Sequence, residues 1–127
     1  MTTRRMILGG LLAGLALGCV SYHTPPVDRR VTVSPYLGTA IWVTDVRLTK
    51  ATSQHYTLQA NVVNNTDGVV RMEYKVVWLD GAGAECDSVV NGWQRMSAAP
   101  RDVVGLTATA PSRDAVDFRL YVQPERP

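Results

Sequence analysis

Apolar residues recur at every second position in residues 69–79, and this period of two is the feature that most limits the fold. One face of the segment holds Val70, Met72, Tyr74, Val76 and Trp78, and the other holds Arg71, Glu73 and Lys75. Successive side chains of a β-strand point to opposite faces of its sheet. The segment is therefore predicted to be a strand with one buried face and one wet face.

The same strand character returns along the chain, with turn residues between the segments. The further predicted strands are residues 39–49, 56–62, 84–89, 92–96, 103–110 and 116–122. In the last of them Val116, Phe118, Leu120 and Val122 are expected to point inward, and Asp117, Arg119 and Tyr121 outward. No helical period appears after the N-terminal apolar run. We predict an all-β protein, an antiparallel immunoglobulin-like β-sandwich of about seven strands, with a β-barrel as the alternative.

Residues 64–68, Asn-Asn-Thr-Asp-Gly, are predicted to close the hairpin between two of these strands. Asn and Gly tolerate a positive φ, and Asn, Thr and Asp side chains form hydrogen bonds within turns. The same residues contain an Asn-X-Thr sequon. The turn explains them better than glycosylation does.

The N-terminus resembles a bacterial lipoprotein signal peptide. An apolar run from Met6 to Gly18 follows Arg4 and Arg5 and is too short to cross a bilayer core of about 30 Å. Gly18 before Cys19 resembles a lipobox, although Ala16 and Leu17 depart from its commonest form. Cleavage before Cys19 and acylation of its thiol are expected; ordinary secretion and an uncleaved anchor are the alternatives.

The export route and the destination are also expectations. Residues 3–8 resemble a twin-arginine signal, but two positive charges in the n-region of an ordinary signal peptide explain them better. Val20 after the cysteine, by resemblance to enterobacterial sorting, implies the periplasmic face of the outer membrane. Acyl chains on Cys19 would anchor the protein there.

The chain divides into three predicted parts: a signal peptide at 1–18, a flexible tether at 19–35 and a β-sandwich domain at 36–127. The tether is rich in proline and lacks a sustained period, which favours an extended spacer. Removing residues 1–18 leaves 109 residues, enough for one domain.

Loss of the signal peptide also removes the chain's net charge. Two of its 13 Lys and Arg residues are Arg4 and Arg5, so 11 remain against 11 Asp and Glu. A neutral chain has no electrostatic footprint for nucleic acid.

The body of the domain resembles the YcfL family of small bacterial envelope lipoproteins. The matching pieces, in order, are Val62–Asn65, Tyr74–Asp80 with Gly83, Trp93, Ala110–Ser112 and Asp117–Leu120. The resemblance covers about residues 54–122, and the lipobox agrees with it. It implies an envelope lipoprotein of unassigned biochemical function, with no catalytic or ligand residues to transfer.

The rest of the sequence offers few candidates for a catalytic or metal-binding site. His23 and His55 stand far apart with no second ligand at metal spacing, so no metal and no cofactor are expected. Cys86 with His55 and Asp45 is the only imaginable nucleophilic constellation, and nothing local supports it. A half-buried cysteine is the simpler interpretation of Cys86. The chain is predicted not to be an enzyme.

A binding role is the remaining expectation. Trp93, Arg95 and Tyr121 are the predicted partner-binding residues, because Trp, Tyr and Arg are the residue types that dominate interface hot spots. The expected partner is an envelope protein, held by these residues or by an open sheet edge. The alternative is a peptidoglycan- or glycan-binding module, in which Trp93, Trp42 and Tyr121 would form one stacking surface.

Overall fold

The computed structural model describes residues 28–50, 54–87 and 92–127. The predicted signal peptide, the lipidation site Cys19 and residues 19–27 of the predicted tether lie outside them. In the part of the chain that is described, no helix has the length and apolar character needed to cross a membrane.

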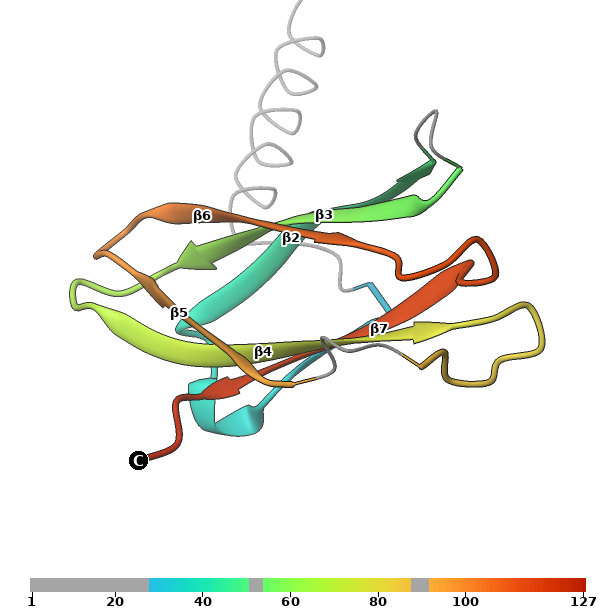
Figure 1. Cartoon of the computed structure of the whole chain (residues 1–127). Coiled ribbons are helices and arrows are strands. Elements are labelled where there is room, and N and C mark those ends of the chain that lie inside the picture. The colour runs from blue at the N-terminus through green and yellow to red at the C-terminus, as the bar shows by residue number, and fades with distance from the viewer. Residues whose placement is uncertain (1–27, 51–53, 88–91) are drawn as a thin grey trace, which may run out of the picture.

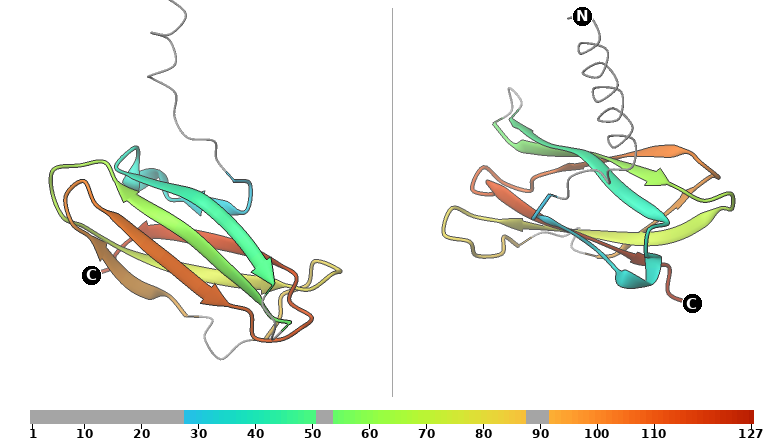
Figure 2. Two further views of the ribbon diagram at one scale, coloured as in Figure 1. Left: turned by 90° about the horizontal axis from the view of Figure 1, so that it is seen from above. Right: turned by 180° about the vertical axis from the view of Figure 1, so that it is seen from behind.

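The described residues form seven strands and one short 3₁₀ helix (Figure 1). These are β1 Val31–Val33, η2 Pro35–Leu37, β2 Ile41–Lys50, β3 Tyr56–Asn64, β4 Val70–Leu79, β5 Gln94–Ala98, β6 Val103–Thr109 and β7 Asp117–Pro124. One sheet has the order β1-β7-β4-β5 and the other the order β2-β3-β6. The two sheets stack as two layers in Figures 1 and 2, which confirms the predicted β-sandwich.

The strand order is that of an immunoglobulin-like sandwich with one change. Immunoglobulin domains place strands A, B and E in one sheet and strands C′, C, F and G in the other. The order β2-β3-β6 matches A-B-E, and β5-β4-β7 matches C′-C-F. Strand β1 occupies the place of G but runs parallel to β7. The prediction of a wholly antiparallel sandwich is therefore wrong at β1.

The core lies between the sheets and follows the predicted alternation. Its buried residues are Val31, Leu37, Ile41, Leu58, Val62, Met72, Trp78, Ala98, Leu106, Ala110, Ala115, Phe118, Leu120 and Val122. At its centre the ring of Phe118 meets Trp78 edge to face, with centroids 6.2 Å apart. Val116, predicted to point inward, is 40% exposed, because β7 begins only at the next residue.

The folded part begins earlier than Tyr36, the predicted start of the domain. Residues Val31–Val33 pair with Leu120–Val122 of β7, so the end of the predicted tether is a strand of the sheet. Val31 is only 9% exposed. A buried apolar residue fixed by a ladder cannot belong to a free spacer, and the predicted boundary at residue 35 is wrong.

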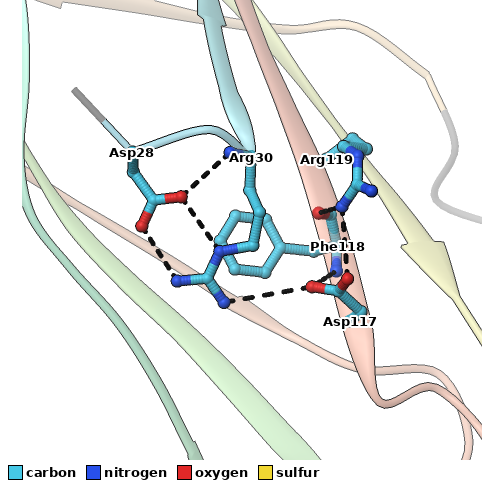
Figure 3. A network of polar contacts seen from close by, with 5 residues as sticks. All are labelled: Asp28, Arg30, Asp117, Phe118 and Arg119. Carbon is cyan, nitrogen blue, oxygen red and sulfur yellow. Dashed lines mark hydrogen bonds and ion pairs between the residues drawn. The ribbon is translucent and has the colours of Figure 1, made fainter.

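An arginine secures β1 against the core (Figure 3). The guanidinium of Arg30 lies 4.6 Å from the centroid of the Phe118 ring, and Asp28 accepts two hydrogen bonds from it, at 3.0 and 2.9 Å. Asp117 lies 3.9 Å away on its other side. The hydrogen bond from Arg30 holds the pKa of Asp28 below its usual value. The contacts make residues 28–30 part of the folded domain.

The strand predicted around residues 84–89 is reduced in its described part to a single β-bridge, which follows a turn at residues 80–84. The Asp80 side chain accepts hydrogen bonds from the N–H groups of Ala82 and Ala84, both at 2.9 Å. These bonds curl the chain after β4, and only Glu85 then makes a β-bridge, to Leu79. Residues 88 and 89 lie outside the described residues.

The turn predicted at residues 64–68 is confirmed, and its first residue has a larger role than a turn requires. Asn64 is 1% exposed. Its Nδ2 donates to the carbonyl oxygens of Gly68, Ala98 and Ala99, at 2.8, 3.1 and 3.0 Å. Its Oδ1 accepts from the backbone and the hydroxyl of Thr66. One buried amide thus joins β3, its own turn and the end of β5.

Candidate functional site

The three residues predicted to bind a partner lie on one surface, the outer face of the β1-β7-β4-β5 sheet. In the register, Arg95 of β5 stands opposite Glu73 of β4, and Tyr121 of β7 stands opposite Lys75 of β4. Trp93 precedes Arg95 by two residues and so shares its side of the sheet. We call this surface the basic face.

Tyr121, Trp93 and Arg95 are accessible to different degrees. Tyr121 is 38% exposed, Trp93 is half-buried and Arg95 is exposed. Each is therefore reachable from solvent, while the neighbouring residues of the strands, such as Val122, are buried in the core. The sequence predicted the three residues one by one; the strand pairing brings them together.

Glu73 is the unexpected centre of the basic face. It was predicted to be wet, but it is 3% exposed. The Nε2 of Gln123 donates to its Oε1 at 2.5 Å, and the Nε of Arg126 lies 2.6 Å from the same oxygen. The guanidinium of Arg126 also lies 5.8 Å from the centroid of the Trp93 ring. The side chains of Gln123 and Arg126 thus cover a carboxylate that alternation alone leaves in water.

A shallow hollow of about 370 Å³ lies beside Glu73, lined by Arg71, Arg95, Met96, Ser97 and Glu125. Within it Arg95 forms an ion pair with Glu125, at 3.3 Å. Among the described residues no carboxylate lies within ion-pair distance of Arg71 or Lys75. The two acidic groups near the hollow, Glu73 and Glu125, are already paired, which leaves the face with cations in excess.

The proposed stacking surface of Trp93, Trp42 and Tyr121 does not exist as one surface. Trp42 pairs with Val63 in the β2-β3-β6 sheet. The flanking pairs, Ile41 with Asn64 and Val43 with Val62, are the inward ones, so Trp42 points outward from the opposite side of the sandwich. A single glycan chain lying on one face cannot contact all three.

The imagined nucleophilic constellation is not assembled either. Asp45 lies in the β2-β3-β6 sheet, where its Oδ2 accepts a hydrogen bond from Asn61 at 3.0 Å. Cys86 instead follows β4, and its backbone N–H donates to the carbonyl of Trp78 at 2.8 Å. The thiol is half-buried against the core, as predicted. The described residues contain no cluster of three or more His, Cys, Asp or Glu residues that could hold a metal ion.

The surroundings of Cys86 suppress its reactivity. Burial raises the pKa of the thiol, and the negative charges of Asp80, Asp114 and Asp87 raise it further. Since the thiolate is the reactive form, we expect alkylation by iodoacetamide at pH 7.5 to be slower than that of a free cysteine peptide. The rate should rise as pH is raised, and Asp114→Asn should increase it modestly. Alkylation at Cys86 as fast as in the peptide would contradict this prediction.

The pairing of Glu73 with Arg126 predicts that removing one partner destabilises the domain more than removing both. Arg126→Met leaves a buried carboxylate with one partner, so we expect a loss of about 1–2 kcal/mol in the free energy of unfolding. The loss is smaller than for an ion pair with both partners buried, because the side chain of Arg126 is exposed. The double variant Glu73→Met with Arg126→Met should recover most of that loss, since no charge is then left unpaired. Urea unfolding of the two variants measures both; a double variant less stable than Arg126→Met would overturn the argument.

Two sheets in this order, with an arginine-clamped first strand and one basic face, define a small variant of the immunoglobulin-like sandwich. A family model described as "Protein of unknown function (DUF1425)" matches residues 28–124. The chain belongs to the DUF1425 family. The matched region begins at Asp28, the first residue that the structure describes.

Two solved structures have the same fold. A DUF1425 family member from Shewanella sp. pv-4 is 22% identical, with a TM-score of 0.62 over 68% of this chain and 80% of the other. The Campylobacter jejuni protein cj0090 is 23% identical, with a TM-score of 0.64 over 77% of this chain and all of the other. No curated protein matches the chain.

Proposed function

We propose that the chain is a YcfL-type lipoprotein, anchored through Cys19 at the periplasmic face of the outer membrane, whose domain binds an envelope protein without catalysing a reaction. The N-terminal run and Gly18–Cys19 support the anchor. The order of Tyr74–Asp80, Trp93 and Asp117–Leu120 supports the YcfL assignment within DUF1425.

The observation that carries the binding role is the gathering of Trp93, Arg95 and Tyr121 on the basic face. Aromatic residues and arginine supply most of the energy at protein interfaces. These three come from β5, its preceding residue and β7, and one of them, Arg95, lines a hollow in which a partner's side chain has room.

The charge of the basic face indicates the partner's chemistry. Arg71 and Lys75 have no acidic partner among the described residues, so an acidic surface or segment complements them. The ion pair of Arg95 with Glu125 in the hollow is an example of the contact that a partner's carboxylate would make with Arg71 or Lys75.

Site-directed photo-cross-linking in living cells tests the proposal. A photoreactive amino acid replaces Tyr121 in the full, lipidated chain, and the matched control carries it at Thr49, an exposed residue on the outer face of the other sheet. We expect one abundant envelope protein to be captured from position 121 and not from position 49. Capture should fall when Cys19→Ser blocks the anchor, and when Lys75→Glu reverses a charge of the face.

The glycan alternative is separated by a second measurement with purified sacculi. Binding that is lost in Trp93→Ala and kept in Trp42→Ala would replace the protein partner with a glycan bound on the basic face. Equal capture of many proteins from positions 121 and 49 would reject a specific role for that face.

A further inference from the structure

The free edge of β6 is the least protected edge of the sandwich. The sheet orders leave four strands at edges: β1, β5, β2 and β6. Sheet edges in soluble proteins are usually blunted by charges, prolines, bulges or short length, because unpaired N–H and C=O groups attract other strands. Three of the four edges carry such a device, and β6 carries none of them.

The other edges show the contrast. β1 has only three residues, β5 contains Arg95, and β2 has a register shift between Thr44 and Arg47 with Asp45 at a φ of 52°. The seven residues of β6 read Val-Val-Gly-Leu-Thr-Ala-Thr, with no charge and no proline. Within the described residues, β6 pairs only with β3.

The backbone groups on the free edge of β6 can be identified from the ladder. The backbone N–H of Asn64 donates to the carbonyl of Asp102, and the N–H of Ala110 donates to the carbonyl of Tyr56. In an antiparallel ladder every second residue of a strand bonds to the same neighbour, so every second residue of β6 between Asp102 and Ala110 bonds to β3. Those positions are Val104, Leu106 and Ala108. The residues between them, Val103, Gly105, Thr107 and Thr109, direct their N–H and C=O groups to the free edge. The Val103 N–H is already satisfied by the Asp102 side chain, at 2.8 Å.

We propose that β6 pairs with β6 of a second copy of this chain, antiparallel and about a two-fold axis at Leu106. This register places Val103 opposite Thr109 of the second copy and Gly105 opposite its Thr107. Each of the four residues whose backbone groups point to the free edge then lies opposite another such residue of the second copy. The two sheets join into one of six strands, β2-β3-β6 continued by its copy.

A second copy suits this edge better than an arbitrary strand because the edge is self-complementary. A two-fold axis at Leu106 places the residues next to it close to their own equivalents, so a charge near the middle of such an edge would lie close to a like charge. An uncharged β6 avoids that repulsion. Asp102, the nearest acid, falls opposite Ala110 of the second copy in this register and not opposite itself.

The contact is small, and we expect the dimer to depend on concentration. One strand pair buries less than the roughly 1,600 Å² of a standard stable interface. Lipid anchors that confine two copies to one membrane raise their effective concentration, so the membrane is where the pair should form.

Disulfide trapping in cells tests the proposal. The full chain carries Val103→Cys and Thr109→Cys in a Cys86→Ser background, and two differently tagged copies are co-expressed. Paired strands bring Cα atoms within disulfide range, so we expect a covalent dimer that contains both tags. The control moves one cysteine to Gln59, the register partner of Thr107 on the central strand β3, and should give no dimer.

Two further variants separate edge pairing from loss of folding. Adding Thr107→Lys should lower the dimer yield about tenfold, whereas Gln59→Lys, the same charge one strand inward, should leave it unchanged. Thr107→Pro removes only an edge-directed N–H, so the domain should fold and the dimer should be lost.

Absence of a covalent dimer, or equal dimer from the Gln59 control, overturns the proposal. Absence of dimer together with loss of a foreign partner in Thr107→Pro would assign the edge to that partner. Photo-cross-linking from position 121 tests the basic face, and its result does not depend on any of these outcomes.

Discussion

A version of the chain that begins at Tyr36 should lose about 3–5 kcal/mol of its free energy of unfolding relative to one that begins at Asp28. The deletion removes β1, whose Val31 is 9% exposed, and with it the guanidinium that covers Phe118. Burying one valine side chain contributes about 1.5–3 kcal/mol, and the uncovered β7 edge loses a parallel ladder as well. Against a typical total of about 5–15 kcal/mol, this loss leaves a marginal domain.

Urea unfolding of three chains, beginning at Thr24, Asp28 and Tyr36, measures this effect. The first two should have the same midpoint, because residues 24–27 precede every contact described for Arg30 and β1. The point variant Arg30→Met in the chain that begins at Asp28 should lie between them and the deletion. A chain from Tyr36 as stable as the chain from Asp28 would mean that β1 lies on the sheet without stabilising it.

The missed first strand illustrates what alternation along the sequence can and cannot predict. Long segments such as β4 and β7 repeat the period of two often enough to identify themselves, and both were predicted within about two residues of their observed bounds. β1 has three residues between Arg30 and Pro35, too few for a period. Its pairing partner lies almost ninety residues away in β7, and no local pattern contains that contact. The converse error is the strand expected at 84–89, which in its described part is only a β-bridge from Glu85 to Leu79.

Three residues of the basic face were predicted one by one, but neither its charge nor its arrangement was. Trp93, Arg95 and Tyr121 were identified as residue types suited to binding, while their common surface depends on β4 pairing with both β5 and β7. Glu73 was missed because its burial comes from Arg126 and Gln123, which lie about fifty residues further along. The one local hint is that the outward positions on either side of Glu73, Arg71 and Lys75, are both basic.

Asn64→Ala should lower the free energy of unfolding by about 3 kcal/mol, a large effect for the loss of a few atoms. The amide of Asn64 donates to three carbonyl oxygens and accepts two hydrogen bonds from Thr66. The side chain is buried, so water cannot take over these bonds. Each buried polar group that loses its partner costs about 1–3 kcal/mol. The Gly68 carbonyl keeps the Thr66 hydroxyl and the Ala99 carbonyl keeps the Asp102 N–H, so the groups that lose most are the Ala98 carbonyl and the Thr66 N–H.

Neighbouring and charge-altering substitutions show whether the effect belongs to the buried network. Asn65→Ala, next in the same turn, removes one exposed hydrogen bond to Thr39, 3.3 Å long, and should cost less than about 0.5 kcal/mol. Asn64→Asp keeps the acceptor oxygen for Thr66 but places a second oxygen against the carbonyls, so it should destabilise more than Asn64→Ala. Thermal unfolding of the three variants gives the order. If Asn65→Ala and Asn64→Ala proved equally damaging, the turn conformation would be the source of stability, and the link that Asn64 makes to the end of β5 would contribute nothing of its own.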